Sequence, residues 1–149
     1  MYLGLDLGTS AVKALLVDAF GTAVASQSVP LQVIRRQAGW SEQDPQSWWD
    51  ATNRAVRSLG AEYPEEMRKI TGIGLSGQMH GLTALDANDT VLRPAILWND
   101  TRSASQAMQL DTGHPAFRQL GGNAVMPGFT APKAVWIAEN EPELFQRLD

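Results

Sequence analysis

The stretch Met1–Val17, MYLGLDLGTSAVKALLV, has the pattern of two short strands joined by a tight polar turn. Apolar residues at positions 3, 5 and 7 alternate with other types, and those at 12, 14 and 16 do the same. This is the period of a half-buried strand. Between the two runs, Gly8, Thr9 and Ser10 form a small turn that carries two hydroxyl groups. The stretch therefore predicts a β-hairpin that begins a sheet.

Asp6 is an acidic residue inside the first apolar strand, two residues before the turn. An unpaired buried carboxylate is costly, so Asp6 needs a partner. One interpretation places it near a cation or a phosphate–Mg²⁺ group, where Gly8 lets backbone N–H groups approach the anion and Thr9 and Ser10 add donors. The other is a plain hairpin whose aspartate caps its own turn. The residues alone leave both interpretations open.

Composition excludes several classes of function. The 149 residues suffice for roughly one domain with its own core, and the net charge of −4 with few clustered basic residues argues against a nucleic-acid surface. The absence of cysteine excludes disulfides, thiolate metal sites and cysteine nucleophiles.

Two features bear on the compartment. No apolar run approaches the roughly 20 residues of a membrane span. The N-terminus also lacks the basic start of a signal peptide. We therefore expect a protein without a membrane-spanning segment, located in the cytoplasm.

The order of elements predicts an α/β fold with a mixed sheet and flanking helices. A third extended segment over 22–33 completes an antiparallel meander. Pro45 then opens a helix with an apolar stripe, which we expect Asp44 to cap and Gly60 to end. The strand predicted over 70–76 follows that helix, so we expect it to run parallel to its neighbour in the sheet.

The second half predicts shorter elements. A short buried strand covers 94–97, a helix runs to Asp111 with Asp100 or Thr101 as its cap, and another helix opens at 130–132. The pair Glu141–Pro142 breaks that helix and begins a last helical turn.

Two loops carry candidate binding residues. His80 follows a predicted strand, at the carboxyl edge where open α/β sheets place ligands, although a structural histidine fits equally well. Trp98 offers an aromatic face to the C–H groups of a sugar ring, and Asp100 offers a partner for hydroxyl groups. Asp100 has the alternative role of a helix cap.

Several catalytic motifs are incomplete. The segment 74–78 resembles a nucleophile elbow but ends in glutamine, the acidic turn at 86–91 lacks calcium-loop ligands, and the two histidines lack zinc spacing. Neither a P-loop lysine motif nor a dinucleotide-binding glycine motif is present.

Five segments together resemble the amino-terminal part of the FGGY carbohydrate kinases, and among them the xylulokinase group. The resemblance covers essentially the whole chain. The segments are Asp6–Ser10, Trp40–Pro45 with the following tryptophans, Gly77–Gly81, Arg93–Arg102 and Met126–Lys133.

The resemblance implies a ribonuclease-H-like fold, shared with actin and Hsp70, and ATP-dependent phosphorylation of D-xylulose at its 5-hydroxyl group. The segments Gln78–Gly81 and Trp98–Asp100 are the motifs most specific to this family, whereas Asp6–Ser10 is shared more widely. Site residues implied for the sugar are Met79 and His80, with Trp98 and Asp100 nearby. Residues implied for the nucleotide are Asp6, which supports catalysis and meets Mg²⁺ through water, then Gly8, Thr9 and Ser10 as the phosphate hairpin, and Lys13.

In that family the aspartate that accepts the proton of the sugar hydroxyl lies beyond residue 149, as does the second, nucleotide-binding domain. We therefore expect residues 1–149 to be an incomplete amino-terminal domain that is inactive alone. Its cut sheet would leave an edge uncovered, which predicts self-association, for example as a homodimer. Alternatives are another FGGY kinase, acting on ribulose, glycerol or gluconate, and a sugar-binding module without catalysis.

Overall fold

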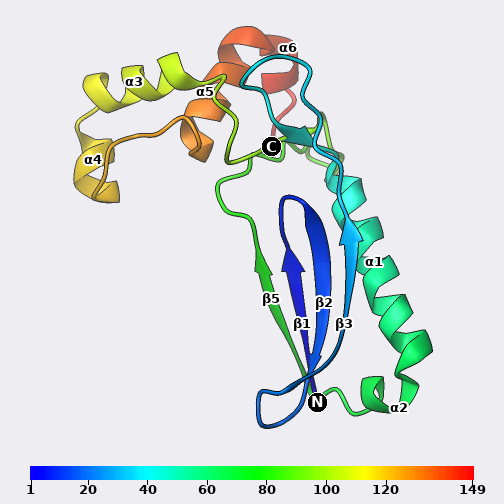
Figure 1. The fold of residues 1–149 in the computed structure, drawn as a ribbon. Helices are drawn as coiled ribbons and strands as arrows, with labels where there is room; N and C mark the ends of the chain where they lie inside the picture. The colour runs from blue at the N-terminus through cyan, green and yellow to red at the C-terminus, as the bar shows by residue number, and fades with distance from the viewer. The chain divides into compact units, whose positions relative to one another are not determined.

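A computed structural model describes all residues from 1 to 149, and they form two compact units (Figure 1). Unit 1 comprises residues 1–33 and 46–78, and unit 2 comprises residues 34–45 and 79–149. Each unit has a hydrophobic core of its own.

Unit 1 is built on a four-stranded sheet in the order β3-β2-β1-β5. Its strands are β1 (Tyr2–Leu7), β2 (Ala11–Val17), β3 (Ala23–Pro30) and β5 (Gly72–Gly77). The first three pair antiparallel, and β5 pairs parallel with β1. The predicted hairpin, meander and parallel strand are thus confirmed, and the sheet is mixed.

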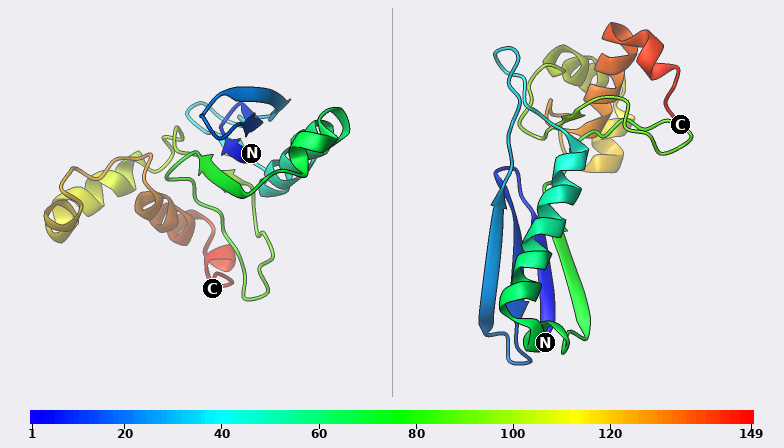
Figure 2. Two further views of the ribbon diagram at one scale, coloured as in Figure 1. Left: turned by 90° about the horizontal axis from the view of Figure 1, so that it is seen from below. Right: turned by 90° about the vertical axis from the view of Figure 1, so that its right-hand side faces the viewer.

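Helix α1 (Pro45–Glu62) lies across one face of this sheet, as the right-hand view of Figure 2 shows, and the short α2 (Pro64–Met67) follows it. The helix runs two residues past Gly60, where we expected it to end. Its buried residues are Ala51, Ala55 and Leu59, and the last two join Leu3, Ala14 and Leu16 in the core. The alternation read from the sequence therefore separates the face under α1 from the opposite face.

Strand β5 lies at the edge of the sheet. Ile73 and Leu75 pair in register with Leu3 and Leu5 of β1, yet they are 63% and 76% exposed. On the opposite face, a Cβ at Gly74 would meet no atom within 4 Å, so nothing packs closely against this glycine. The predicted uncovered edge is thus confirmed as a row of exposed apolar side chains.

Unit 2 is mostly helical. It contains the two-stranded pair β4 (Glu42–Gln43) and β6 (Ala95–Ile96), and helices α3 (Ala104–Gly113), α4 (Ala116–Gly121), α5 (Thr130–Asn140) and α6 (Pro142–Phe145). Helix α4 is an addition to the predicted elements. The hydrophobic core of unit 2 consists of Leu82, Ala84, Ile96 and Ile137. None of the helices in either unit is both long and apolar enough to span a membrane.

Candidate functional site

The turn between β1 and β2 is held by main-chain and side-chain hydrogen bonds. Gly8 N donates to Ala11 O at 3.1 Å, and a Cβ at Gly8 would lie only 3.1 Å from that same oxygen. Thr9 Oγ1 donates to Gln78 Oε1 at 3.0 Å, which ties the turn to the end of β5. Ser10 is exposed. The turn is therefore a tight, anchored hairpin that presents a hydroxyl group to solvent.

Asp6, Lys13 and Ser76 lie on the sheet face opposite α1. They occupy paired register positions on β1, β2 and β5, and all three are exposed. Ser76 Oγ donates to Asp6 Oδ1 at 2.8 Å. They border a shallow depression of about 440 Å³, which Gly4 and Gly74 also line. The structure thus places a carboxylate, an ammonium group and a hydroxyl group around one open surface of unit 1.

The aspartate does not cap its own turn: its carboxylate accepts from Ser76, 70 residues away in the sequence. Few side chains in the chain are placed to hold a metal ion. No group of three or more histidine, cysteine, aspartate or glutamate side chains lies close enough together to form a metal site. A cation near Asp6 would take most of its ligands from elsewhere.

His80 begins the loop that enters unit 2, and its backbone is unusual. Its φ is 58°, in the left-handed region that non-glycine residues seldom adopt. Its imidazole packs against the ring of Phe129, with ring centroids 4.7 Å apart and the ring planes tilted by 41°, and both His80 and Met79 are exposed. A strained and exposed polar residue is typical of a binding site, which supports the ligand-facing interpretation.

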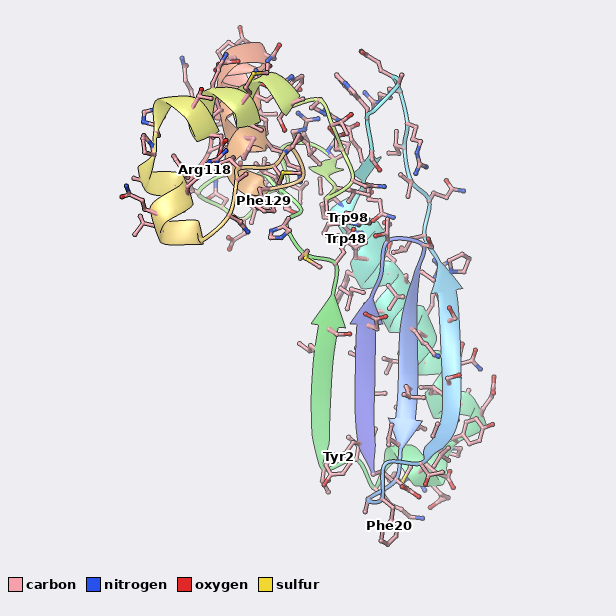
Figure 3. All side chains as sticks on the ribbon, turned by 60° about the vertical axis from the view of Figure 1, so that its left-hand side comes forward. Tyr2, Phe20, Trp48, Trp98, Arg118 and Phe129 are labelled. Carbon is pink, nitrogen blue, oxygen red and sulfur yellow. The ribbon has the colours of Figure 1, made fainter.

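Trp98 is the second residue of the loop after β6, and it is 48% exposed. Figure 3 labels Trp98 and Phe129, the aromatic residue that precedes α5. The main chain of Trp98 lies against Gly128, where a Cβ would be 2.4 Å from Trp98 O. Only glycine fits this close approach of two loops.

Asp100 is buried, and its carboxylate oxygens both accept hydrogen bonds. Oδ2 accepts from Ser41 N at 2.6 Å and from Arg102 Nη2 at 2.8 Å, while Oδ1 accepts from Arg102 N and Nε at 2.9 and 3.0 Å. The prediction that Asp100 or Thr101 caps the next helix is wrong, because α3 begins at Ala104 with Ser103 as its N-cap. Asp100 instead fixes the loop that carries Trp98.

Arg102 is the centre of a buried ionic cluster. Its guanidinium contacts Glu42 at 2.8 Å as well as Asp100, and it lies over the ring of Trp40, 3.7 Å from the centroid. Arg93 extends the cluster from Glu42 to Glu141. Charges buried in this way are compensated by pairing. No local sequence pattern predicts this cluster, because Ser41 and Asp100 are 59 residues apart.

Lys133 is a functional candidate that the residue types did not single out. It lies in the first turn of α5, is fully buried, and donates from Nζ to His80 O and Gly128 O, both at 2.7 Å. Burial lowers its pKa to about 8, with Asp100 acting in the opposite direction and Arg102 adding to the decrease. Lysine is seldom fully buried, so nothing in its type predicts this environment.

Comparison with known proteins agrees with these motifs. The profile of the FGGY family of carbohydrate kinases, N-terminal domain, matches residues 1–149. The chain is 49% identical to the xylulose kinase of Escherichia coli (strain K12) and 50% identical to that of Klebsiella pneumoniae. Each match covers 100% of this chain and 30% of the relative, so the chain spans about a third of the length of these proteins.

Solved structures have the same fold. A xyloylose kinase from Brucella ovis matches with a TM-score of 0.96 and 58% identity, over 99% of this chain and 30% of that one. A gluconate kinase from Lactobacillus acidophilus matches with a TM-score of 0.90 and 29% identity, over the same shares. The mixed sheet with flanking helices is thus that of sugar kinases with the actin- and Hsp70-like fold. The chain belongs to the FGGY family of carbohydrate kinases, and residues 1–149 match the N-terminal domain of that family.

Proposed function

We propose that the protein carrying this chain transfers the γ-phosphoryl group of ATP to the 5-hydroxyl group of D-xylulose. The observation that carries the proposal is His80, an exposed residue with a left-handed backbone in unit 2, the unit that also carries the exposed Trp98. The chain is also about half identical to xylulose kinases. In this proposal Met79, His80 and Trp98 contact the sugar. Asp100, whose oxygens are occupied, acts by holding the Trp98 loop.

The proposal assigns the phosphates of ATP to unit 1. Gly8, Thr9 and Ser10 would face phosphate oxygens, and Lys13 would add a positive charge. The single exposed carboxylate of Asp6 fits a Mg²⁺ ion that keeps several waters and takes its other ligands from the nucleotide, as this ion usually does. Bound Mg²⁺ supplies neutralisation of the phosphate charge, and the residues of the hairpin supply positioning.

Phosphoryl transfer also needs a group that accepts the proton of the sugar hydroxyl. Asp100 does not suit this role, since it is 1% exposed and paired with Arg102. We propose that the acceptor belongs to a part of the protein outside residues 1–149.

ADP release tests the proposal. The 149-residue chain and a longer protein that contains it would be given MgATP with D-xylulose, L-ribulose, glycerol or gluconate. We expect no release by the chain alone and release by the longer protein that is fastest with D-xylulose. Release by the chain alone would contradict the assigned place of the proton acceptor. A preference of the longer protein for gluconate, the substrate in the name of one structural relative, would contradict the assigned sugar.

The variant His80→Ala separates sugar contact from a structural role. We expect the KM for the sugar to rise at least about tenfold while the KM for ATP changes less than about twofold, because uniform binding of one substrate is lost. Equal rises in both constants would show that His80 is structural.

A further inference from the structure

Lys133 is fully buried in the chain, and its side chain carries an ammonium group. The two other lysines, Lys13 and Lys69, are exposed. An ammonium group out of water is costly unless its N–H groups find acceptors. Those acceptors are main-chain carbonyl oxygens, of His80 and Gly128, each 2.7 Å from Nζ. Lys133 therefore fastens two loops of unit 2 to the first turn of α5.

The first of these loops is the one in which His80 has its left-handed backbone. Such a conformation persists in a non-glycine residue only where the surroundings impose it. Here Thr130 Oγ1 also donates to His80 O, at 3.3 Å, and the ring of Phe129 packs against the imidazole. Three residues at the start of α5 thus fix both the main chain and the ring of His80.

The second loop is the one that supports Trp98. Gly128, whose carbonyl oxygen accepts from Lys133, lies directly against the main chain of Trp98. Ser103 Oγ donates to Pro127 O at 3.1 Å, which adds a second hydrogen bond to the same loop. The Lys133 ammonium is therefore the one group bonded both to His80 and to the residue that abuts Trp98.

We infer that Lys133 is a positioning residue of the sugar site, whose ammonium group sets the arrangement of His80 relative to Trp98. The inference rests on the proposed function, in which these two side chains contact the sugar. Lys133 itself is buried and does not touch the sugar. An alternative is a lysine that stabilises unit 2 without effect on sugar binding.

Kinetics of the longer protein distinguish the two roles. In Lys133→Met, which keeps the apolar stem and removes the donors, we expect the KM for the sugar to rise at least about tenfold, with the KM for ATP changed less than about twofold. Lys69→Met is the matched control, and both constants should stay unchanged. A correctly folded Lys133→Met enzyme with an unchanged KM for the sugar, or with equal rises in both constants, would overturn the inference.

A second variant covers the case in which Lys133→Met does not fold. Thr130 is exposed and donates the longer bond to His80 O, so Thr130→Val perturbs the same carbonyl and leaves the buried ammonium in place. We expect a rise of about two- to fivefold in the KM for the sugar alone. Thr112→Val, which removes a hydroxyl bond within α3, is its control. No change in Thr130→Val would count against the inference.

A spectroscopic measurement on the 149-residue chain does not depend on the identity of the sugar. In Lys133→Met we expect the amide NMR signals of His80, Gly81 and Gly128 to shift, while those of β1 and β2 stay in place. Unshifted His80 and Gly128 signals would overturn the inference even if D-xylulose kinase activity were confirmed. Shifted signals in a protein that lacks activity on D-xylulose would instead mean that the proposed function fails.

Discussion

At the scale of single residues, Lys133 gives the chain a pH dependence with a defined sign. Its pKa is about 8 in the folded chain and 10.5 in an unfolded one. Between these pH values the unfolded chain binds more protons, so the contribution of Lys133 to the free energy of unfolding increases as the pH rises from about 8 to 10.5. Below pH 8 the cost of burying the charged group is constant.

Urea unfolding of the chain and of Lys133→Met, followed by tryptophan fluorescence, checks this. We expect the difference in unfolding free energy between the two to change by on the order of 1–3 kcal/mol in favour of the lysine between pH 7.5 and 10.5. The same comparison with Lys69→Met should give a constant difference. A constant difference for Lys133→Met as well would contradict the assigned pKa. Asp100 and Arg102 are the charged groups that act on the ammonium.

The residues also show which parts of the site the sequence could predict. The loop positions of His80 and Trp98 followed from strand ends and from motif resemblance, and both side chains are exposed there. The buried, hydrogen-bonded environment of Asp100 could not be predicted from the sequence. Its partners come from Ser41 and Arg102, and only the folded chain brings residue 41 beside it. Local pattern carries no information on such distant pairs.

At the scale of elements, strand β5 is one of the two edge strands of the sheet, the other being β3. The apolar residues Ile73 and Leu75 of β5 are largely exposed. Its backbone pairs with β1 along one side, and no strand pairs with its other side. An open edge with apolar side chains is a template for pairing with another chain. We expect the 149-residue chain to self-associate with increasing concentration.

Sedimentation velocity of Leu75→Lys checks this expectation. A charge on the edge should weaken association at least about fivefold. Phe20→Lys is the matched control, because Phe20 is 95% exposed in the turn between β2 and β3, away from the edge. If Phe20→Lys weakened association as much as Leu75→Lys, the site of contact would not be β5.

The elements themselves were largely predictable. Alternation in β1 and β2 and the stripe of α1 both arise from burial against one shared core, so the pattern and the structure have the same cause. Helix α4 was not predicted. It has only six residues, so its apolar residues Phe117 and Leu120, both exposed, do not extend into a repeating helical pattern.

At the scale of the whole molecule, the chain has two cores with no residue in common. Leu59 is fully buried in the core of unit 1, and Ile137 is fully buried in that of unit 2. Truncating a buried leucine or isoleucine to alanine costs about 2–5 kcal/mol. Because stability is not uniform across a structure, we expect each loss to fall mainly on its own unit.

Hydrogen exchange of the amides checks this. Leu59→Ala should accelerate exchange in β1 and β2 at least about tenfold more than in α5, and Ile137→Ala should show the reverse. Acceleration of both units to the same extent by either variant would mean that the chain unfolds as one cooperative block.

Because the ammonium group of Lys133 is buried, its reactivity can report what fraction of the chains is folded in unit 2. Reagents that acylate amines act on accessible groups, and the folded chain offers Lys13, Lys69 and the exposed N-terminal amine. Lys133 is hidden until unit 2 opens. A brief acylation followed by mass measurement would therefore divide a sample into chains with three added groups and chains with four. The relative amounts of the two species report the fraction of chains in which unit 2 has opened.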